Sequence, residues 1–355
     1  MSKVAIITDL HFGARGDATT FVDYMDKFYT NTFFPTLKER GIKTILNLGD
    51  TFDRRKYINY HSLKRSRQFF FDPIKDAGMN MWMLAGNHDT YYKNTNDTNS
   101  IDLLLNDYQN ITTIPEAMDI TVDGREIFML PWICTDNYEE SMKRMQDSTA
   151  EICMGHLEIS GFVMHRGVKS HGGLNRERFN KFALVYSGHY HHRNNDGHVY
   201  YLGNPYELTW SDYKDPRGFH IWDTETMNLE FIPNPYTMFE RVEYDDANNS
   251  YDDYDATIMA DKYVKVIVAN KTDFNKFDSF MKKIYKAGPH DVRIIEDFNE
   301  FRDGEIDEEL NLEDTMNILN SYVESVETTV DKEKVKGFLR GLYAEAQTLE
   351  SETAE

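Results

Sequence analysis

Five short polar motifs, each directly after a short apolar run, constrain the fold of this chain more than any other feature. The apolar runs cover residues 4–7, 44–48, 81–84, 152–154 and 184–186. The motifs that follow them are Asp9-x-His11, Gly49-Asp50-x-x-Asp53, Gly86-Asn87-His88-Asp89, Gly155-His156 and Gly188-His189-x-His191. Short apolar runs bounded by glycine and polar residues predict buried strands, so each motif is expected in a loop at a strand's end. Because such loops gather functional groups in open α/β sheets, we expect the five motifs to converge.

The side chains in these motifs form a mixed set of metal ligands. They offer carboxylate oxygens, one amide oxygen and imidazole nitrogens, and no thiolate. That combination suits Mn, Fe or Zn better than the all-oxygen cages typical of Mg and Ca. Two metals about 3.5–4 Å apart need a ligand that they share, and a carboxylate on a tight turn can supply it. We therefore expect Asp50 to bridge a pair of metal ions.

Each motif alone has an ordinary structural explanation. An Asp-x-His sequence after a strand is common in satisfied turns, and Gly-Asn-His-Asp suits the N-terminus of a helix, because Asn and Asp cap well. The order and spacing of all five motifs favour the metal site.

Taken together, the motifs resemble the calcineurin-like metallophosphoesterase superfamily, whose pattern is D-x-H, G-D-x-x-D, G-N-H-D/E, a later His and G-H-x-H. The resemblance covers roughly the first 240 residues and implies an α/β fold, a four-layer α-β-β-α sandwich. It also implies two divalent metal ions. Mn²⁺ is the preferred metal and Mg²⁺ is the alternative. The ligand sets that it implies are Asp9, His11, Asp50 and His191 for one ion, and Asp50, Asn87, His156 and His189 for the other.

The remaining motif residues are candidates for the chemistry itself. His88 stands beside a ligand without being needed as one, so it could hold a proton against the phosphate or pass one to the leaving oxygen. The alternative is that His88 only orients a neighbouring carboxylate. We expect Asp53, grouped with His88 in the catalytic machinery, and Asp89 to fix imidazole tautomers. A water bridging two metal ions would become hydroxide and attack phosphorus in line.

The position of Asp53 distinguishes branches of the family. Archaeal and eukaryotic members of the family have a histidine there. The aspartate of this chain resembles the bacterial and phage members. A mechanism in which two histidines share substrate protonation is therefore in doubt for this chain.

The net charge does not exclude nucleic acid as a partner. The whole chain carries −21, but residues 1–240 carry −7 and residues 241–355 carry −14. Basic residues cluster at 54–56, at 64–67 and between 165 and 181. Phosphate contacts need only local positive potential, although the 64–67 cluster is equally typical of a solvated helical face.

The rest of the chain divides by composition. We expect a metallophosphoesterase domain at 1–240, a linker at 245–255, and a small α+β capping domain at 258–297. In the small domain, strands at 263–269 and 292–295 flank a helix at 273–286, with Gly288-Pro289 as the stop. An acidic linker at 298–310 and a C-terminal helical hairpin at 311–350 complete the layout. The hairpin's apolar face either packs back on the small domain or docks on a partner.

This layout is similar to that of the SbcD-type DNA repair nucleases. The stretch from Gly155 to Phe162 is especially similar to the small subunits of the recombination endonucleases of T4-like phages. The resemblance implies 3′ to 5′ exonuclease action on duplex ends and endonuclease action on single strands. It also implies an SMC-like ATPase partner bound by the tail helices, and a homodimer formed through helices near 58–75 and 100–106.

Two other function classes stay open. A protein or nucleotide phosphomonoesterase would use the same metals, and Asp53-Arg54 resembles the Asp-Arg of Ser/Thr phosphatases, but those enzymes have Glu where this chain has Asp89. A non-catalytic scaffold with vestigial metal sites is the other. No apolar stretch approaches the roughly 20 residues that a bilayer requires, and residues 1–10 are not expected to be a signal peptide. With two cysteines and no C-x-x-C, we expect a cytoplasmic protein, in the host cytoplasm if phage-encoded.

Overall fold

The computed structural model describes residues 3–165 and 168–296, together with five isolated positions, Val323, Lys332, Val335, Lys336 and Leu339. The acidic linker predicted at 298–310 lies outside the described residues, as does nearly all of the helical hairpin predicted at 311–350. No helix in the described ranges is long and apolar enough to cross a membrane.

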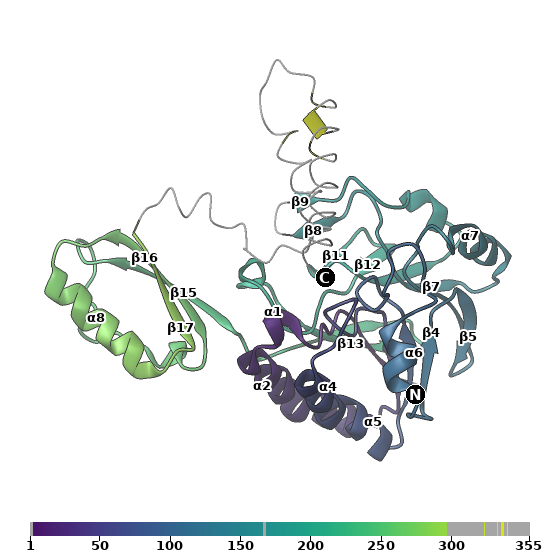
Figure 1. Ribbon diagram of the computed structural model, residues 1–355, viewed down its shortest axis with the longest axis horizontal. Helices are drawn as coiled ribbons and strands as arrows, with labels where there is room; N and C mark the ends of the chain where they lie inside the picture. Colours follow the sequence, from purple (N-terminus) through teal and green to yellow (C-terminus); the bar gives the residue numbers. More distant parts are fainter. Residues whose placement is uncertain are drawn as a thin grey trace, which may run out of the picture.

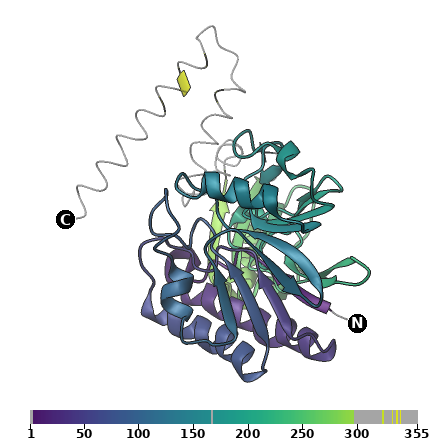
Figure 2. The same ribbon diagram turned by 90° about the vertical axis from the view of Figure 1, so that its right-hand side faces the viewer.

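Two six-stranded sheets form the body of the molecule (Figures 1 and 2). The first sheet has the order β14 (Leu229–Pro233), β13 (Gly218–Asp223), β1 (Lys3–Ile7), β2 (Thr44–Asn47), β3 (Asn80–Leu84) and β4 (Ile111–Ile114). The second has the order β11 (Asn194–Asn195), β12 (Val199–Tyr201), β10 (Leu184–Gly188), β7 (Ile152–His156), β6 (Arg125–Leu130) and β5 (Met118–Val122). All five apolar runs that precede the motifs are strands, as predicted.

The two sheets pack face to face and helices cover their outer faces. Between the sheets lies an apolar core that includes Val4, Leu46, Met154 and Trp222. The outer face of the first sheet is covered by α2 (Thr19–Phe28), α3 (Phe34–Glu39), α4 (Tyr60–Ser66), α5 (Asp72–Asp76) and α6 (Ser100–Leu105). Helix α7 (Tyr138–Asp147) covers the outer face of the second sheet. This is the predicted α-β-β-α sandwich.

The shorter elements join these layers. The short turn α1 (Ala14–Asp17) precedes α2, and π-helical turns at Tyr29–Phe33 and Arg67–Phe71 join α2 to α3 and α4 to α5. A pair of short strands, β8 (Val163–His165) and β9 (Val168–Lys169), follows β7. 3₁₀ turns occur at Arg176–Phe179, Trp210–Asp212 and Thr257–Met259.

Strand direction explains why the motifs meet. Strands β1, β2 and β3 run parallel in the first sheet, and β7 and β10 run parallel in the second. The carboxyl ends of parallel strands lie at one edge of a sheet, so the loops after these strands face one another across the sandwich.

A third, smaller sheet lies beside the sandwich (Figure 1). Its parallel strands are β15 (Phe239–Asp245), β16 (Tyr263–Asn270) and β17 (Asp291–Ile295), and α8 (Phe274–Ala287) packs on one face. Asp273 caps α8 by accepting hydrogen bonds from the main-chain N–H of Asn275 and Lys276. Gly288 ends α8 at φ 79°, as the predicted stop requires. The predicted strand-helix-strand order is confirmed.

The linker predicted at 245–255 is wrong. β15 ends at Asp245 and is the third strand of the small sheet, and the aromatic residues that follow it enter the core beneath α8. Tyr251 stacks on Tyr244 at 4.7 Å between ring centroids, and Tyr254 lies 5.2 Å from Phe280. The Asp, Asn and Ser content of this segment led to the prediction of a linker, although its tyrosines hold it to the small sheet.

Candidate metal centre

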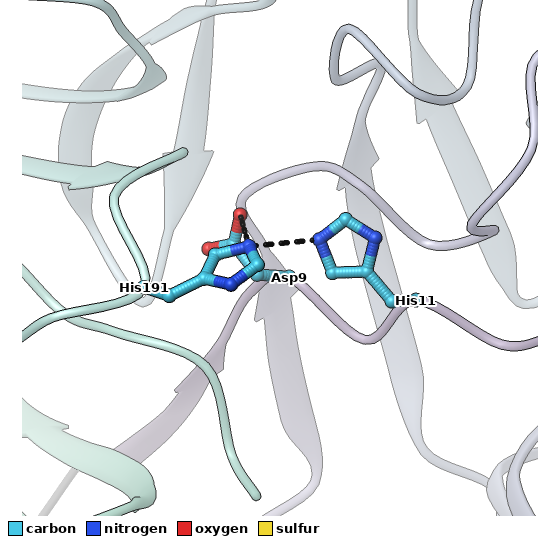
Figure 3. Close-up of side chains that lie close together, drawn as sticks. All are labelled: Asp9, His11 and His191. Carbon is cyan, nitrogen blue, oxygen red and sulfur yellow. Dashed lines mark hydrogen bonds and ion pairs between the residues drawn. The ribbon is translucent and has the colours of Figure 1, made fainter. Parts of the chain in front are cut away.

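Loops from both sheets bring most of the motif residues to one place at the edge of the sandwich; Gly155 and His156, expected in a loop, are instead the last two residues of β7. Figure 3 shows the imidazoles of His11 and His191 turned toward each other beside the Asp9 carboxylate. The two Nε2 atoms are 3.0 Å apart, and His191 Nε2 is 4.0 Å from Asp9 Oδ1. Asp9 and His11 follow β1 in the first sheet, whereas His191 follows β10 in the second.

A second group forms next to the first. Its members are Asp50, Asn87, His156 and His189. The amide oxygen of Asn87 lies 2.9 Å from His156 Nε2 and 3.0 Å from His189 Nδ1. Three different strands, β3, β7 and β10, therefore present one amide oxygen and two imidazole nitrogens to a common point.

Asp50 stands between the two groups. Its Oδ2 atom is 3.8 Å from His11 Nε2 and 3.3 Å from His156 Nε2. Its other oxygen, Oδ1, accepts a hydrogen bond of 2.8 Å from the main-chain N–H of His88. One carboxylate oxygen thus faces imidazoles of both groups while the second fixes the carboxylate's orientation.

Hydrogen bonds set which ring nitrogen faces the site. His156 Nδ1 lies 2.8 Å from the carbonyl oxygen of Leu48, so Nδ1 carries a proton and Nε2 is the nitrogen that faces the site. His11 Nδ1 lies 3.3 Å from Asp53 Oδ1, and its Nε2 likewise points to the site. These outer contacts prepare imidazoles to bind a cation.

The backbone at the site adopts unusual conformations. Asp9, His11, Asp50 and His189 have positive φ angles of 55°, 44°, 52° and 84°. Such conformations cost a non-glycine residue about 1–2 kcal/mol each, and they cluster where function requires them. Main-chain bonds hold them in place, among them Asp9 N–H to the Gly49 carbonyl and His11 N–H to the Asp50 carbonyl, each 3.0 Å.

Two motif glycines are required because side chains of neighbouring motifs lie very close to their Cα atoms. A Cβ on Gly86 would lie 2.2 Å from Asp50 Oδ1, and a Cβ on Gly49 would lie 2.5 Å from His156 Nδ1. Both distances are well inside van der Waals contact. The glycines that precede Asp50 and Asn87 therefore let the ligand-bearing loops pack against one another.

Charge at the site favours cations. Burial by itself lowers the pKa of His11, but Asp53, Asp50 and Asp9 outweigh burial and raise that pKa to about 9. For His156, burial is likewise outweighed, mainly by Asp50, and the pKa rises to about 9. Burial would raise the pKa of Asp50, yet His156, His88 and His11 hold it well below its usual value. The buried carboxylates thus draw positive charge into the site, and together with the mixed O/N donor set they fit a divalent metal.

Asp89 corrects one expectation. Its buried carboxylate accepts hydrogen bonds from the main-chain N–H groups of Thr51, Phe52 and Gly86 at 3.0–3.2 Å. Burial, reinforced by Asp50, raises its pKa to about 6. Asp89 therefore ties the loop after β2 to the loop after β3, and the prediction that it fixes an imidazole is wrong.

His88 and Asp53 lie at the outer side of the first group. His88 is half-buried; its Nδ1 is 2.5 Å from the main-chain oxygen of Asp53, so that nitrogen carries the proton. The rings of His88 and His11 meet edge to face at 4.8 Å between centroids. Asp53 thus contacts His11 through its carboxylate and His88 through its carbonyl.

Several arginines of the basic clusters noted in the sequence form ion pairs. Arg54 lies 2.8 Å from Asp17, Arg65 lies 2.8 Å from Asp26, and Arg67 lies 3.1 Å from Asp107. These pairs favour the ordinary explanation, a solvated face, for the cluster at 64–67.

Sequence reasoning missed two residues that support the site. The Trp132 ring lies 5.1 Å from the His189 ring and 6.2 Å from the His156 ring. Its position after the apolar run 127–130 was the available signal. Buried Arg217 donates to the main-chain oxygen of His191 and forms an ion pair of 2.7 Å with Asp212. No motif in the sequence pointed to Arg217.

Known proteins are similar to this chain in sequence. Residues 2–193 match the calcineurin-like phosphoesterase family. The chain is 32% identical over 312 residues to exonuclease subunit 1 of Enterobacteria phage T4, an alignment that spans 87% of this chain and 89% of the phage protein. The chain therefore belongs to the calcineurin-like phosphoesterases, as its motifs predict, and it is a metal-dependent phosphodiesterase.

Solved structures resemble it more distantly. An archaeal phosphodiesterase is 12% identical, with 65% of this chain and 99% of that one covered, at a TM-score of 0.33. A dimetal phosphatase from Danio rerio is 10% identical, with 62% and 91% covered, at a TM-score of 0.36.

Proposed function

We propose that this chain is a DNA nuclease that hydrolyses phosphodiesters with a pair of divalent metal ions, Mn²⁺ in the first place. The observation that carries this is Asp50 Oδ2, which lies 3.8 Å from His11 Nε2 and 3.3 Å from His156 Nε2. A single carboxylate between two imidazole groups suits a ligand shared by two metals. The likeness to a phage exonuclease subunit supports DNA as the substrate.

The proposed ligand sets are those expected from the motifs: Asp9, His11, Asp50 and His191 for one ion, and Asp50, Asn87, His156 and His189 for the other. Bound there, the ions would supply a hydroxide near neutral pH and neutralise phosphate oxygens. The outer contacts of His11 with Asp53 and of His156 with Leu48 keep each Nε2 turned inward. Hydrogen bonds from His189 N–H to both Asp9 oxygens, at 3.0 and 3.2 Å, join the two sides of the site.

His88 is the proposed proton donor. Its Nδ1 proton is held by the Asp53 carbonyl, so Nε2 is the atom that would carry a proton to the leaving oxygen. Asp53 acts through His88 and His11, and is therefore a positioning residue. Because position 53 holds an aspartate and not a second histidine, His88 alone would protonate the leaving oxygen.

The phosphomonoesterase alternative depends on Arg54. That arginine would have to bind the substrate phosphate, but it pairs with largely buried Asp17 at 2.8 Å and stacks over Tyr57 at 5.0 Å. The pairing favours the diesterase. In Arg54→Ala, we expect diester cleavage to continue; loss of a strong monoester activity in that variant would favour the alternative.

A homodimer through α4 and α6 is the proposed assembly. Both helices expose apolar side chains, with Tyr60 87% and Leu103 65% exposed. Arg67, just after α4, bonds to the main-chain oxygen of Leu104 in α6, so the two helices form one surface. Light scattering should show that Leu103→Asp converts a dimer to a monomer. Leu104→Asp is not a suitable control, because it would test the packing of α6 and not the dimer.

We further propose an SMC-like ATPase partner bound by residues 311–350, with both proteins in the host cytoplasm. The support is the resemblance to two-component repair nucleases and the designation of the phage relative as a subunit. Removal of residues 335–355 should abolish co-purification with such an ATPase and leave metal-dependent cleavage intact. Retention of the partner would reject this role for the tail.

The direct test of the nuclease is cleavage of end-labelled duplex and single-stranded DNA with Mn²⁺, beside a phosphomonoester. We expect 3′ to 5′ degradation of duplex ends and internal cuts in single strands. His88→Ala should lose diester cleavage while it still binds Mn²⁺, and Lys143→Met on exposed α7 serves as control. Turnover of the monoester alone would place the chain among the phosphatases, and failure to bind Mn²⁺ at all would favour a scaffold.

A further inference from the structure

A cavity separate from the metal centre opens between the two sheets at their β11 and β14 edges. Its volume is about 550 Å³, in the range of small-molecule sites. Strands β10 and β12 form one wall, and β13 and β14 form the other. None of the candidate metal ligands lines it.

The walls of this cavity are aromatic. Tyr186 and Tyr200 come from the second sheet, with ring centroids 5.6 Å apart. His220 and Phe231 come from the first sheet, with centroids 5.2 Å apart. Paired rings on both sides of a space suit a planar ring system placed between them, because offset and edge contacts between aromatic groups are favourable.

Two nitrogen-bearing side chains in the cavity form no hydrogen bond with a described residue. The Arg193 guanidinium lies over the Phe231 ring at 3.5 Å from the centroid, and makes no hydrogen bond or close ion pair with any described residue. The His220 side chain is 97% buried and, in the part of the chain that the structure describes, has no hydrogen-bond partner. His220 lines the cavity, so a ligand bound there would be within reach of ring nitrogens that no described residue engages.

Charges around the cavity favour an anion at its mouth. Burial, with help from Arg193, lowers the pKa of His220 to about 3, so the imidazole is neutral and Arg193 supplies the positive charge. The one carboxylate in the lining, Asp215, is already paired with Arg217 and His192, each at 2.7 Å. Arg193 is thus the group left to pair with an incoming anion.

We propose that this cavity binds a nucleoside monophosphate. The base stacks on the tyrosines of the second sheet with one edge toward His220, and the imidazole bonds to that edge. The phosphate pairs with Arg193 at the mouth, where Asn194 and Asn195 offer side-chain amides. The site does not depend on the metals or on the proposed nuclease activity.

The test is calorimetric titration of the full chain with dAMP, in EDTA so that metal-held phosphate does not contribute. We expect saturable binding at one site per chain. Arg193→Met should weaken it about tenfold or more, since a charge-assisted contact is lost. Leu229→Trp, which fills the cavity from β14, should abolish it, and Lys143→Met should leave it unchanged.

His220→Phe separates binding from folding. It replaces a neutral imidazole that makes no hydrogen bond to a described residue with an apolar ring, so we expect an unchanged or higher Tm together with weaker dAMP binding. Absence of saturable binding to wild type, or equal binding by wild type, Arg193→Met and Leu229→Trp, would overturn the proposal. Inorganic phosphate or adenosine binding as tightly as dAMP would also overturn it, because both parts of the ligand are required.

Discussion

The metal-centre loops and the small sheet follow opposite physical rules. The loops bury Asp9, Asp50 and Asp89, and they hold several non-glycine residues at positive φ. In residues 239–296 no charged or polar side chain is buried, and α8 has a regular cap at each end. A structure that keeps buried charge and backbone strain in one region, and avoids buried charge in another, indicates where function resides.

The largest expected effect comes from Asp50. Asp50→Asn keeps the shape but removes the charge shared by the two groups, so diester cleavage should fall at least about a thousandfold. The measurement is the initial rate of duplex degradation with Mn²⁺. Asp278→Asn, the same change on exposed α8, is the matched control. An Asp50→Asn rate above a tenth of wild type would contradict the assignment.

Glycine substitutions sharpen the contrast. Gly86→Ala places a Cβ 2.2 Å from Asp50 Oδ1, so it must displace the carboxylate and should reduce cleavage about a hundredfold. At Gly288 nothing lies within 4 Å of a new Cβ, and only the φ of 79° opposes it. Gly288→Ala should lower the free energy of unfolding by about 1 kcal/mol and spare activity. Normal cleavage rates in Gly86→Ala would show that the close approach of Asp50 does not require a glycine at this position.

Stability should depend on pH through the metal site. The pKa values of His11 and His156 are raised from 6.5 to about 9 in the metal-free fold. Folding therefore favours their protonated forms, a stabilisation complete below pH 6.5 and lost as the pH rises through about 9. We expect the Tm in EDTA to fall across this window, measured by circular dichroism. A Tm that rises between pH 6.5 and 9 would show the opposite charge balance.

The smallest effect belongs to the small sheet. Asp273→Ala removes the cap of α8 and should cost about 1 kcal/mol of unfolding free energy in urea titrations. Cleavage by the folded protein should be unchanged, with Asp273→Asn, which can still cap, as the control. A loss of activity without a loss of stability would link α8 to the metal centre.

The parts that the sequence predicted are those with local signals. The strands before the motifs are apolar runs, and the paired Asp and His residues mark their own loops. Strand β15 escaped prediction because adjacent Glu240 and Arg241 interrupt the alternation of apolar and charged residues in Phe239–Asp245, and an Asp-rich segment follows. The packing of Tyr251 on Tyr244 is specified only once the small sheet has formed.

Roles set by tertiary contacts could not be deduced. Nothing in Gly86-Asn87-His88-Asp89 says that Asp89 binds main-chain N–H groups 37 and 38 residues away. Arg217 is 26 residues from the carbonyl of His191 that it holds. The cavity likewise joins β10, β12, β13 and β14, whose neighbours are fixed by topology.

The central claim is that Asp50 joins two metal ions. Electron paramagnetic resonance of the full chain titrated with Mn²⁺ tests it most directly. We predict two Mn²⁺ per chain and a spectrum split by exchange between two neighbouring ions. One Mn²⁺ per chain, or a six-line spectrum of isolated ions at saturation, would contradict a bridged pair.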